Sequence, residues 1–242
     1  MSDSMNDFFT NNNYGFSAIE VDNLGASEYT LVSVLVDVSG SIYGFEKDLE
    51  KTIKEVISSC SKSPRVNNLM VRLVQFNTSV TETHGFKLLS EINPSDYDNT
   101  LSTGGGTSLY DAMHSAIDAT SSYAGVLDDQ GISVNSILFV VTDGADNSST
   151  YTPNQIRKLL DKTKLDEILE SINVVLVGVN DSSLGSYFDD LRSKANLDNY
   201  ISLGDVDSNK LAKLAQFISQ SISSTSQSLG SGSSAQLSNF TF

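Results

Sequence analysis

The segment Asp37-Val-Ser-Gly-Ser41 places three oxygen-bearing side chains at alternate positions, directly after the apolar run 31–36. Such a run predicts a buried strand, and the turn after it can direct a carboxylate and two hydroxyls at one point. Hard divalent cations such as Mg²⁺ prefer oxygen ligands, in near-octahedral geometry. The residue types and their spacing therefore favour a metal site that includes Asp37, Ser39 and Ser41.

Two later segments can supply further oxygen ligands. Thr107 lies in the glycine-rich stretch 104–108, and Asp143 ends the apolar run that begins at Phe139. In any one segment, residues of these types also serve as helix caps and turn formers. Because three such segments occur in one chain, we favour the metal site over that purely structural interpretation.

The three segments together resemble the metal-ion-dependent adhesion site (MIDAS) of the von Willebrand factor type A domain. The pattern of that site is Asp-x-Ser-x-Ser, then a distant Thr and a distant Asp, each on a loop at the top of a parallel sheet. All five positions are present, as Asp37, Ser39, Ser41, Thr107 and Asp143. The resemblance extends over residues 28–224, and the chain looks like a stand-alone, intracellular member of bacterial or phage type.

The resemblance implies a role for each of these residues. Ser39 and Ser41 would coordinate the metal directly, and Thr107 would join them directly or through water. Asp37 and Asp143 would do either, depending on the state of the site. The implied cofactor is Mg²⁺, with Mn²⁺ or Ca²⁺ as alternatives. The implied function is divalent-metal-dependent binding of a partner protein through one of its Glu or Asp side chains.

From Tyr29 onward, short β-branched runs alternate with helical periods, which predicts an α/β fold. We expect a Rossmann-like, doubly wound, mostly parallel sheet of six strands with helices on both faces. The segment 79–83 should form an antiparallel edge strand, because it follows the strand at 69–76 too closely for a parallel crossover. The expected strands are 31–36, 69–76, 79–83, 137–141, 174–179 and 200–203, and the expected helices are 45–60, 109–117, 153–169, 184–195 and 211–222.

The sequence divides into a domain and two polar ends. Residues 1–27 are rich in asparagine but contain aromatic residues, so this leader is either disordered or packs its aromatic rings on the domain. Residues 28–224 form the type A domain by resemblance. Residues 225–242 are rich in serine and glycine, and their low apolar content predicts a disordered tail.

The net charge of the chain argues against nucleic acid as a partner. Its 242 residues include 30 acidic and 15 basic side chains, for a formal net charge of −15. This excess would repel DNA or RNA.

The N-terminus lacks the basic start of a signal peptide, and no segment has the roughly 20 apolar residues of a membrane helix. We therefore expect no nucleic acid or membrane partner, and a cytoplasmic protein or one assembled into a particle from the cytoplasm.

Catalytic alternatives fit the sequence poorly. A phosphatase of the haloacid dehalogenase type needs a second carboxylate where this chain has Ser39. The glycine run 104–106 lacks the lysine of a phosphate-binding loop, and no Gly-x-Ser-x-Gly elbow is present. We therefore expect a binding protein and no enzyme.

A structural role is the alternative function. The chain would then be a subunit of a larger assembly, for example a phage particle. The aromatic residues of the leader and the end Phe240-Thr-Phe242 would dock onto neighbouring subunits, and the metal would be secondary.

Overall fold

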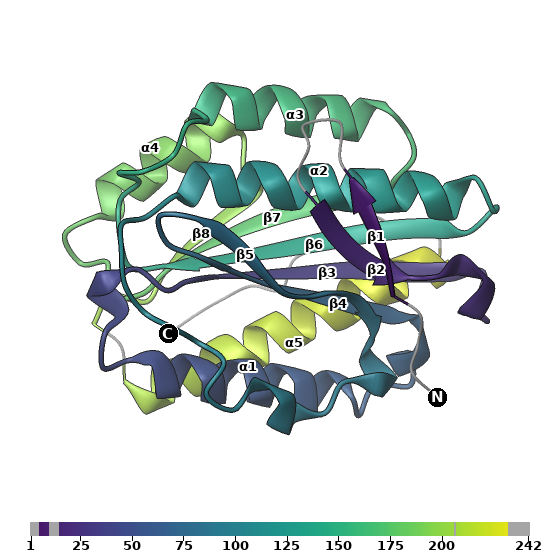
Figure 1. Cartoon of the computed structure of the whole chain (residues 1–242), viewed down its shortest axis with the longest axis horizontal. Helices are drawn as coiled ribbons and strands as arrows, with labels where there is room; N and C mark the ends of the chain where they lie inside the picture. The colour runs from purple at the N-terminus through teal and green to yellow at the C-terminus, as the bar shows by residue number, and fades with distance from the viewer. Residues whose placement is uncertain (1–4, 10–14, 206, 232–242) are drawn as a thin grey trace.

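The computed structural model describes residues 5–9, 15–205 and 207–231. Within these residues, eight strands form one sheet in the order β1-β2-β5-β4-β3-β6-β7-β8 (Figure 1). Strands β3, β4, β6, β7 and β8 are parallel, and β5 is antiparallel to β4. The strands are β1 (Met5–Phe9), β2 (Gly15–Ile19), β3 (Glu28–Asp37), β4 (Leu69–Phe76), β5 (Val80–Leu88), β6 (Ser133–Thr142), β7 (Ser171–Gly178) and β8 (Asn199–Ser202).

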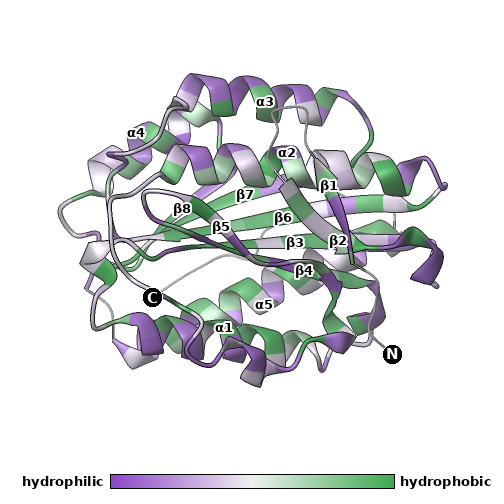
Figure 2. Cartoon of the chain, in the orientation of Figure 1, coloured by the Kyte–Doolittle hydropathy of each residue, from purple (hydrophilic) through white to green (hydrophobic). Residues whose placement is uncertain are grey.

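Helices cover both faces of the sheet. On one face lie α1 (Glu46–Cys60) and α5 (Ser208–Ser231), and on the other lie α2 (Leu109–Asp128), α3 (Pro153–Leu165) and α4 (Gly185–Ala195) (Figure 1). Because side chains alternate along a strand, β3 buries Val32, Val34 and Val36 on the α1 side and Leu31 and Leu35 on the α2 side. The central strands are accordingly hydrophobic along most of their length (Figure 2). No helix in the described part of the chain combines the length and the apolar composition needed to cross a membrane.

The predicted fold class is confirmed, and the sheet has two strands more than the six expected. Strands β1 and β2 both come from the segment 1–27, so β5 lies inside the sheet and β1 forms its edge. The sequence around these strands lacks a β-branched run and is interrupted by asparagines. Their extended conformation depends on pairing with distant strands, which a local pattern does not reveal.

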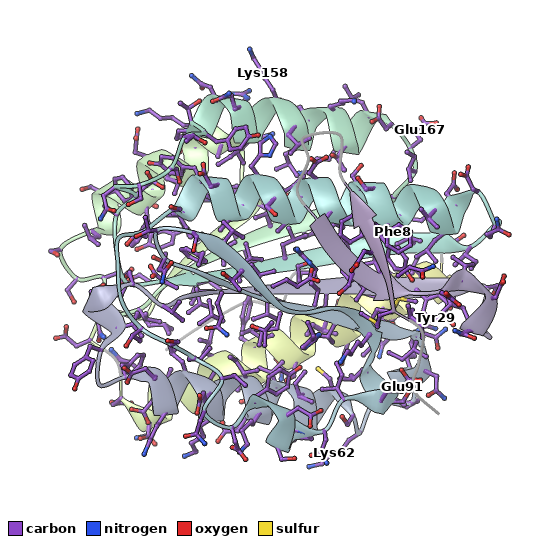
Figure 3. The ribbon with its side chains drawn as sticks, in the orientation of Figure 1. Phe8, Tyr29, Lys62, Glu91, Lys158 and Glu167 are labelled. Carbon is purple, nitrogen blue, oxygen red and sulfur yellow. The ribbon has the colours of Figure 1, made fainter. Side chains whose placement is uncertain are left out.

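The β1–β2 hairpin packs on the domain through aromatic rings. Phe16 of β2 is 3% exposed and meets Phe86 of β5 edge to face, with ring centroids 6.5 Å apart. Phe8, labelled in Figure 3, stacks on Phe16 at 5.4 Å. Of the two interpretations of the leader, the described residues therefore show the packed one. Residues 1–4 and 10–14, including Tyr14, lie outside the described part.

A buried ion pair between β4 and β5 also holds the β1–β2 hairpin in place. Arg72 of β4 donates from Nε to Glu82 of β5 at 2.6 Å, and Arg72 is 2% exposed. The second oxygen of Glu82 accepts hydrogen bonds from the backbone N–H and the hydroxyl of Ser17, at 2.8 and 2.7 Å. One carboxylate thus connects β2, β4 and β5.

Three helices end at places that the sequence does not indicate. Helix α2 runs to Asp128, well past the expected residue 117. Helix α5 continues past residue 225, where the tail was expected, because polar contacts replace apolar ones there. The side-chain amide of Asn135 donates to the carbonyl oxygen of Thr225, and Arg65 donates to the hydroxyl of Ser226 at 2.8 Å. Residues 232–242, including Phe240 and Phe242, lie outside the described part. Helix α3 ends at Leu165, before the expected residue 169, and Glu167 beyond it (Figure 3) has a positive φ of 54°.

Candidate metal centre

The topology brings the three oxygen-rich segments to one edge of the sheet. Strands β3 and β6 are parallel neighbours, so Asp37 at the end of β3 and Asp143 just after β6 leave the sheet side by side. The glycine loop joins them through backbone hydrogen bonds. The N–H of Gly104 donates to the carbonyl of Val38 at 2.8 Å, and the N–H of Gly40 donates to the carbonyl of the neighbouring Gly105 at 3.1 Å. The site thus lies beyond the carboxyl ends of parallel strands, as expected for an open α/β sheet.

Four of the five predicted residues form a chain of hydrogen bonds. The backbone N–H of Ser39 donates to Asp37 Oδ1 at 2.8 Å. The hydroxyls of Ser39 and Ser41 are 3.1 Å apart, and Ser41 donates to Asp143 Oδ1 at 2.7 Å. Asp37 and Ser39 are buried, whereas Ser41 is exposed and Asp143 is half-buried. The chain of oxygens therefore leads from the interior to an open side.

Gly144 brings Thr107 into the same group. A Cβ atom placed on Gly144 would lie 3.4 Å from Thr107 Oγ1 and 4.0 Å from both Asp37 Oδ2 and Ser41 Oγ. Oxygens from the loops of Asp37 and Thr107 therefore lie beside Gly144 of a third loop, which has no side chain to fill the space. Such a set of hydroxyl and carboxylate oxygens fits the ligand preference of Mg²⁺.

Hydroxyls are essential to this donor set. In the described ranges, no group of three or more His, Cys, Asp and Glu residues is placed to hold a metal. A cation at this site would therefore depend on Ser39, Ser41 and Thr107 as well as on the two carboxylates. Neutral ligands leave the cation with much of its positive charge.

The electrostatics of the two carboxyl groups also suit a cation. Burial raises the pKa of Asp37 above its ordinary value, although hydrogen bonds from Thr142 and Ser39 oppose the rise, and the charge of Asp143 adds to it. Burial likewise raises the pKa of Asp143, against a hydrogen bond from Ser41. A neighbouring positive charge favours the ionised form of a carboxyl group, so a bound cation would relieve both costs.

Two further residues support the site, and the first of them, Thr142, was not singled out from the sequence. The hydroxyl of Thr142 donates to Asp37 Oδ2 at 2.6 Å. The side-chain carbonyl of Asn147 accepts from the N–H of Thr107 at 2.8 Å, and the N–H of Asn147 donates to the carbonyl of Thr107 at 3.0 Å. The available signal was the position of Thr142 directly before Asp143, at the carboxyl end of a strand.

Asp111 braces the loop that follows Asp143. Its Oδ1 atom accepts hydrogen bonds from the backbone N–H groups of Thr150 and Tyr151, at 2.9 and 2.8 Å. This carboxylate of α2 thereby fixes the far end of the loop that carries Asp143 and Asn147. The positions of the candidate ligands are thus set by contacts between different loops.

Comparison with known families shows to which family the chain with this arrangement of oxygen atoms belongs. The profile of the von Willebrand factor type A domain matches residues 32–232, which is most of the chain. The chain belongs to the von Willebrand factor type A domain family. A sequence comparison with curated proteins finds no match.

Solved structures share the fold of this type A domain. The PilB minor pilin from Streptococcus sanguinis is 16% identical, with a TM-score of 0.56 over 85% of this chain and 64% of that one. A von Willebrand factor type A protein from Catenulispora acidiphila is 16% identical, with a TM-score of 0.55 over 87% of this chain and 44% of that one. Proximal thread matrix protein 1 from the mussel byssus, with a zinc-occupied MIDAS motif, is 17% identical, with a TM-score of 0.52 over 81% of this chain and 46% of that one. The chain therefore spans less than two thirds of the length of each of these proteins.

Proposed function

We propose that this type A domain is a protein-binding module that depends on a divalent metal and performs no catalysis. The observation that carries the proposal is the convergence of oxygens from two loops beside Gly144 of a third loop, in which the neighbouring Asp143 accepts a hydrogen bond from Ser41. The metal would be Mg²⁺ in the first place, with Mn²⁺ or Ca²⁺ as alternatives. The residues that would hold it are Asp37, Ser39, Ser41, Thr107 and Asp143.

The partner would supply a Glu or Asp side chain. When bound, Mg²⁺ supplies positive charge and a coordination position open to an anionic oxygen. The buried Asp37 and Ser39 define the floor of the site, and the exposed Ser41 marks the side from which a partner would approach. Membership of the type A family and the zinc-occupied MIDAS motif of the mussel protein support this proposal.

The assembly function has less support from the described residues. In that alternative the aromatic leader docks onto neighbouring subunits. Phe16 is buried against Phe86 of its own domain and Phe8 stacks on Phe16, so these rings are already used within the chain. The minor pilin among the proteins of similar fold is a component of an assembly, and this is the observation that favours the alternative.

Affinity capture from the native cell extract tests the proposed function. Immobilised wild-type protein should retain a partner in Mg²⁺ and release it in EDTA, and Ser39→Ala should retain none. Ser102→Ala is a matched control, because Ser102 is an exposed serine on a loop of the same edge and is not among the candidate ligands. A partner retained equally in Mg²⁺, in EDTA and by Ser39→Ala would contradict metal-dependent capture and favour docking through another surface.

A further inference from the structure

Tyr43 is an unusually exposed aromatic residue beside the candidate metal centre. It follows Ser41 by two positions, and 83% of its surface is accessible. Within the described residues, the other large hydrophobic side chain with comparable exposure is Leu165, at 79%. Leu165 ends α3 shortly before Glu170, and the N–H of Glu170 donates to the carbonyl of Val134 near the start of β6. Leu165 therefore lies near the amino ends of the parallel strands, away from the candidate metal centre.

The turn that carries Tyr43 is held in place from both sides. Ile42 is 1% exposed, and its carbonyl accepts a hydrogen bond from the N–H of Phe45 at 2.9 Å. Gly44 has a φ of +89°, a conformation that favours glycine, and its N–H donates to Glu46 Oε2 at 2.8 Å. A tyrosine on a fixed turn loses little conformational entropy when it binds, and exposed tyrosines are common anchors of protein interfaces.

The other carboxylate oxygen of Glu46 connects this turn to the glycine loop. It accepts a hydrogen bond from the hydroxyl of Thr103 at 2.9 Å. The turn of Tyr43 and the loop of Thr107 are thus parts of one connected rim. A partner residue bound at the metal centre would bring its neighbours within reach of the tyrosine ring.

The charges of the rim restrict what can lie next to that residue. Segments 38–46, 77–79, 102–108 and 143–150 contain no Lys or Arg and include the acidic Glu46, Asp143 and Asp146. The exposed Lys47 follows directly, and its charge acts on Glu46. With these three carboxylates against Lys47, a second acidic side chain would still meet an excess of like charge. An aliphatic or aromatic side chain would instead gain by covering the ring of Tyr43.

We infer that Tyr43 is a second recognition element, which packs on an apolar side chain adjacent to the acidic residue of the partner. The preferred ligand is a segment with one Glu or Asp next to an aliphatic or aromatic residue, and a run of acidic residues is disfavoured. This inference rests on the proposed function of the metal centre. It adds a preference that metal coordination alone does not provide.

Selection from a displayed library of random peptides tests the inference. Peptides are selected on the wild-type protein in Mg²⁺, and those that persist in EDTA are discarded. We expect enrichment of a single acidic residue with an apolar neighbour. Selection on Tyr43→Ser should keep the acidic residue and lose the apolar preference. Leu165→Ser, which removes the other exposed hydrophobic side chain, should give the wild-type result, and Tyr43→Phe should retain the preference.

The affinity of one selected peptide gives the size of the effect. Its Kd in Mg²⁺ should weaken by about tenfold in Tyr43→Ser and remain unchanged in Leu165→Ser. Enrichment of an acidic residue without an apolar neighbour would overturn the inference and leave the proposed function intact. Peptides without an acidic residue, or no enrichment at all, would overturn both.

Discussion

At the scale of single residues, the candidate centre depends on the way in which Asp37 is held. Its carboxylate is fully buried, and each oxygen has its own donor, the N–H of Ser39 on one side and the hydroxyl of Thr142 on the other. A carboxylate fixed in this way keeps its orientation without a metal, and such supporting contacts tune metal affinity. Thr142 is therefore a positioning residue.

Replacing Thr142 tests this role. Thr142→Val should weaken Mg²⁺ affinity by roughly 10-fold or more, because the carboxylate loses its orienting hydrogen bond. It should also lower the free energy of unfolding of the metal-free protein by about 1–3 kcal/mol, since a buried acceptor loses its donor. Titration calorimetry and urea unfolding measure the two effects. Thr142→Ser keeps the hydroxyl and should restore the affinity, and equal affinity in both variants would contradict the role.

The metal itself should stabilise the fold through the same residues. With Mg²⁺ at about 100 times its Kd, binding adds about 2.7 kcal/mol, which raises the Tm of a domain of this size by roughly 5–10 °C. Ser41→Ala should lose most of this rise, and Ser102→Ala should keep it. Thermal unfolding in Mg²⁺ and in EDTA measures the difference. A rise of equal size in all three proteins would place the metal elsewhere.

At the scale of elements, the β1–β2 hairpin packs against β5 at a glycine, Gly85. A Cβ atom on Gly85 would lie 1.7 Å from the backbone oxygen of Ser17, so only glycine allows β2 to approach β5 this closely. The single register pair between the two strands is Ala18 with Phe86. The contact is short, and its geometry is therefore sensitive to a single methyl group.

Gly85→Ala should loosen the hairpin. We expect a loss of about 1–3 kcal/mol in the free energy of unfolding and faster amide hydrogen exchange over residues 15–19. Gly125→Ala is the matched control, because Gly125 lies in α2 with no atom within 4 Å of its added Cβ. That helical substitution should be neutral or stabilise by up to about 1 kcal/mol. Similar exchange over residues 15–19 in both variants would show that the close contact is not required.

The pH dependence of stability involves a histidine that links β5 to the segment 94–97. His84 Nε2 lies 2.7 Å from the hydroxyl of Tyr97, and burial lowers the pKa of His84 below its ordinary value. The unfolded chain therefore takes up this proton at a higher pH than the folded one, near about pH 6.5. The free energy of unfolding should fall as the pH decreases from about 7 to 5.

His84→Gln isolates this contribution. Glutamine can still bond to Tyr97 but does not titrate, so the variant should lose less stability than the wild type over the same pH range. Burial also lowers the pKa of His114, so His114→Gln provides a parallel comparison and the double variant should be the least pH-dependent. Urea unfolding at several pH values measures the slopes. Identical slopes in the wild type and in His84→Gln would refute the assignment.

At the scale of the whole molecule, net charge opposes compactness. With 30 acidic and 15 basic residues, the folded chain concentrates a formal charge of −15 on one domain. Added salt screens repulsion between surface charges. We therefore expect the urea midpoint of the EDTA-treated protein to rise as NaCl increases from about 0.02 to 0.3 M. A lower midpoint at high salt would mean that local ion pairs, such as Arg72 with Glu82, outweigh the overall repulsion.

The sequence alone determined the fold class and which residues could meet at a site. Short β-branched runs and helical periods are local patterns, so the six strands from Leu31 to Leu203 and their helices were foreseeable. The positions of Asp37, Thr107 and Asp143 after apolar runs or within a glycine loop indicated one edge of a parallel sheet. The structure brings all five predicted residues together there, and their binding of a metal remains a prediction.

Only the tertiary structure decided the features that depend on partners distant in the sequence. The hairpin strands exist through the pairing of β2 with β5 and the bonds between Ser17 and Glu82, and the later turns of α5 are held by Asn135 and Arg65. The hairpin strands have only five residues each, and the later turns of α5 are polar, so neither segment shows a sustained hydrophobic periodicity from which a strand or helix is inferred. The supporting contacts of Thr142 and Asn147 likewise join separate loops. A hydrogen bond between residues far apart in the chain leaves no local pattern, and its donor and acceptor become partners only when the sheet has formed.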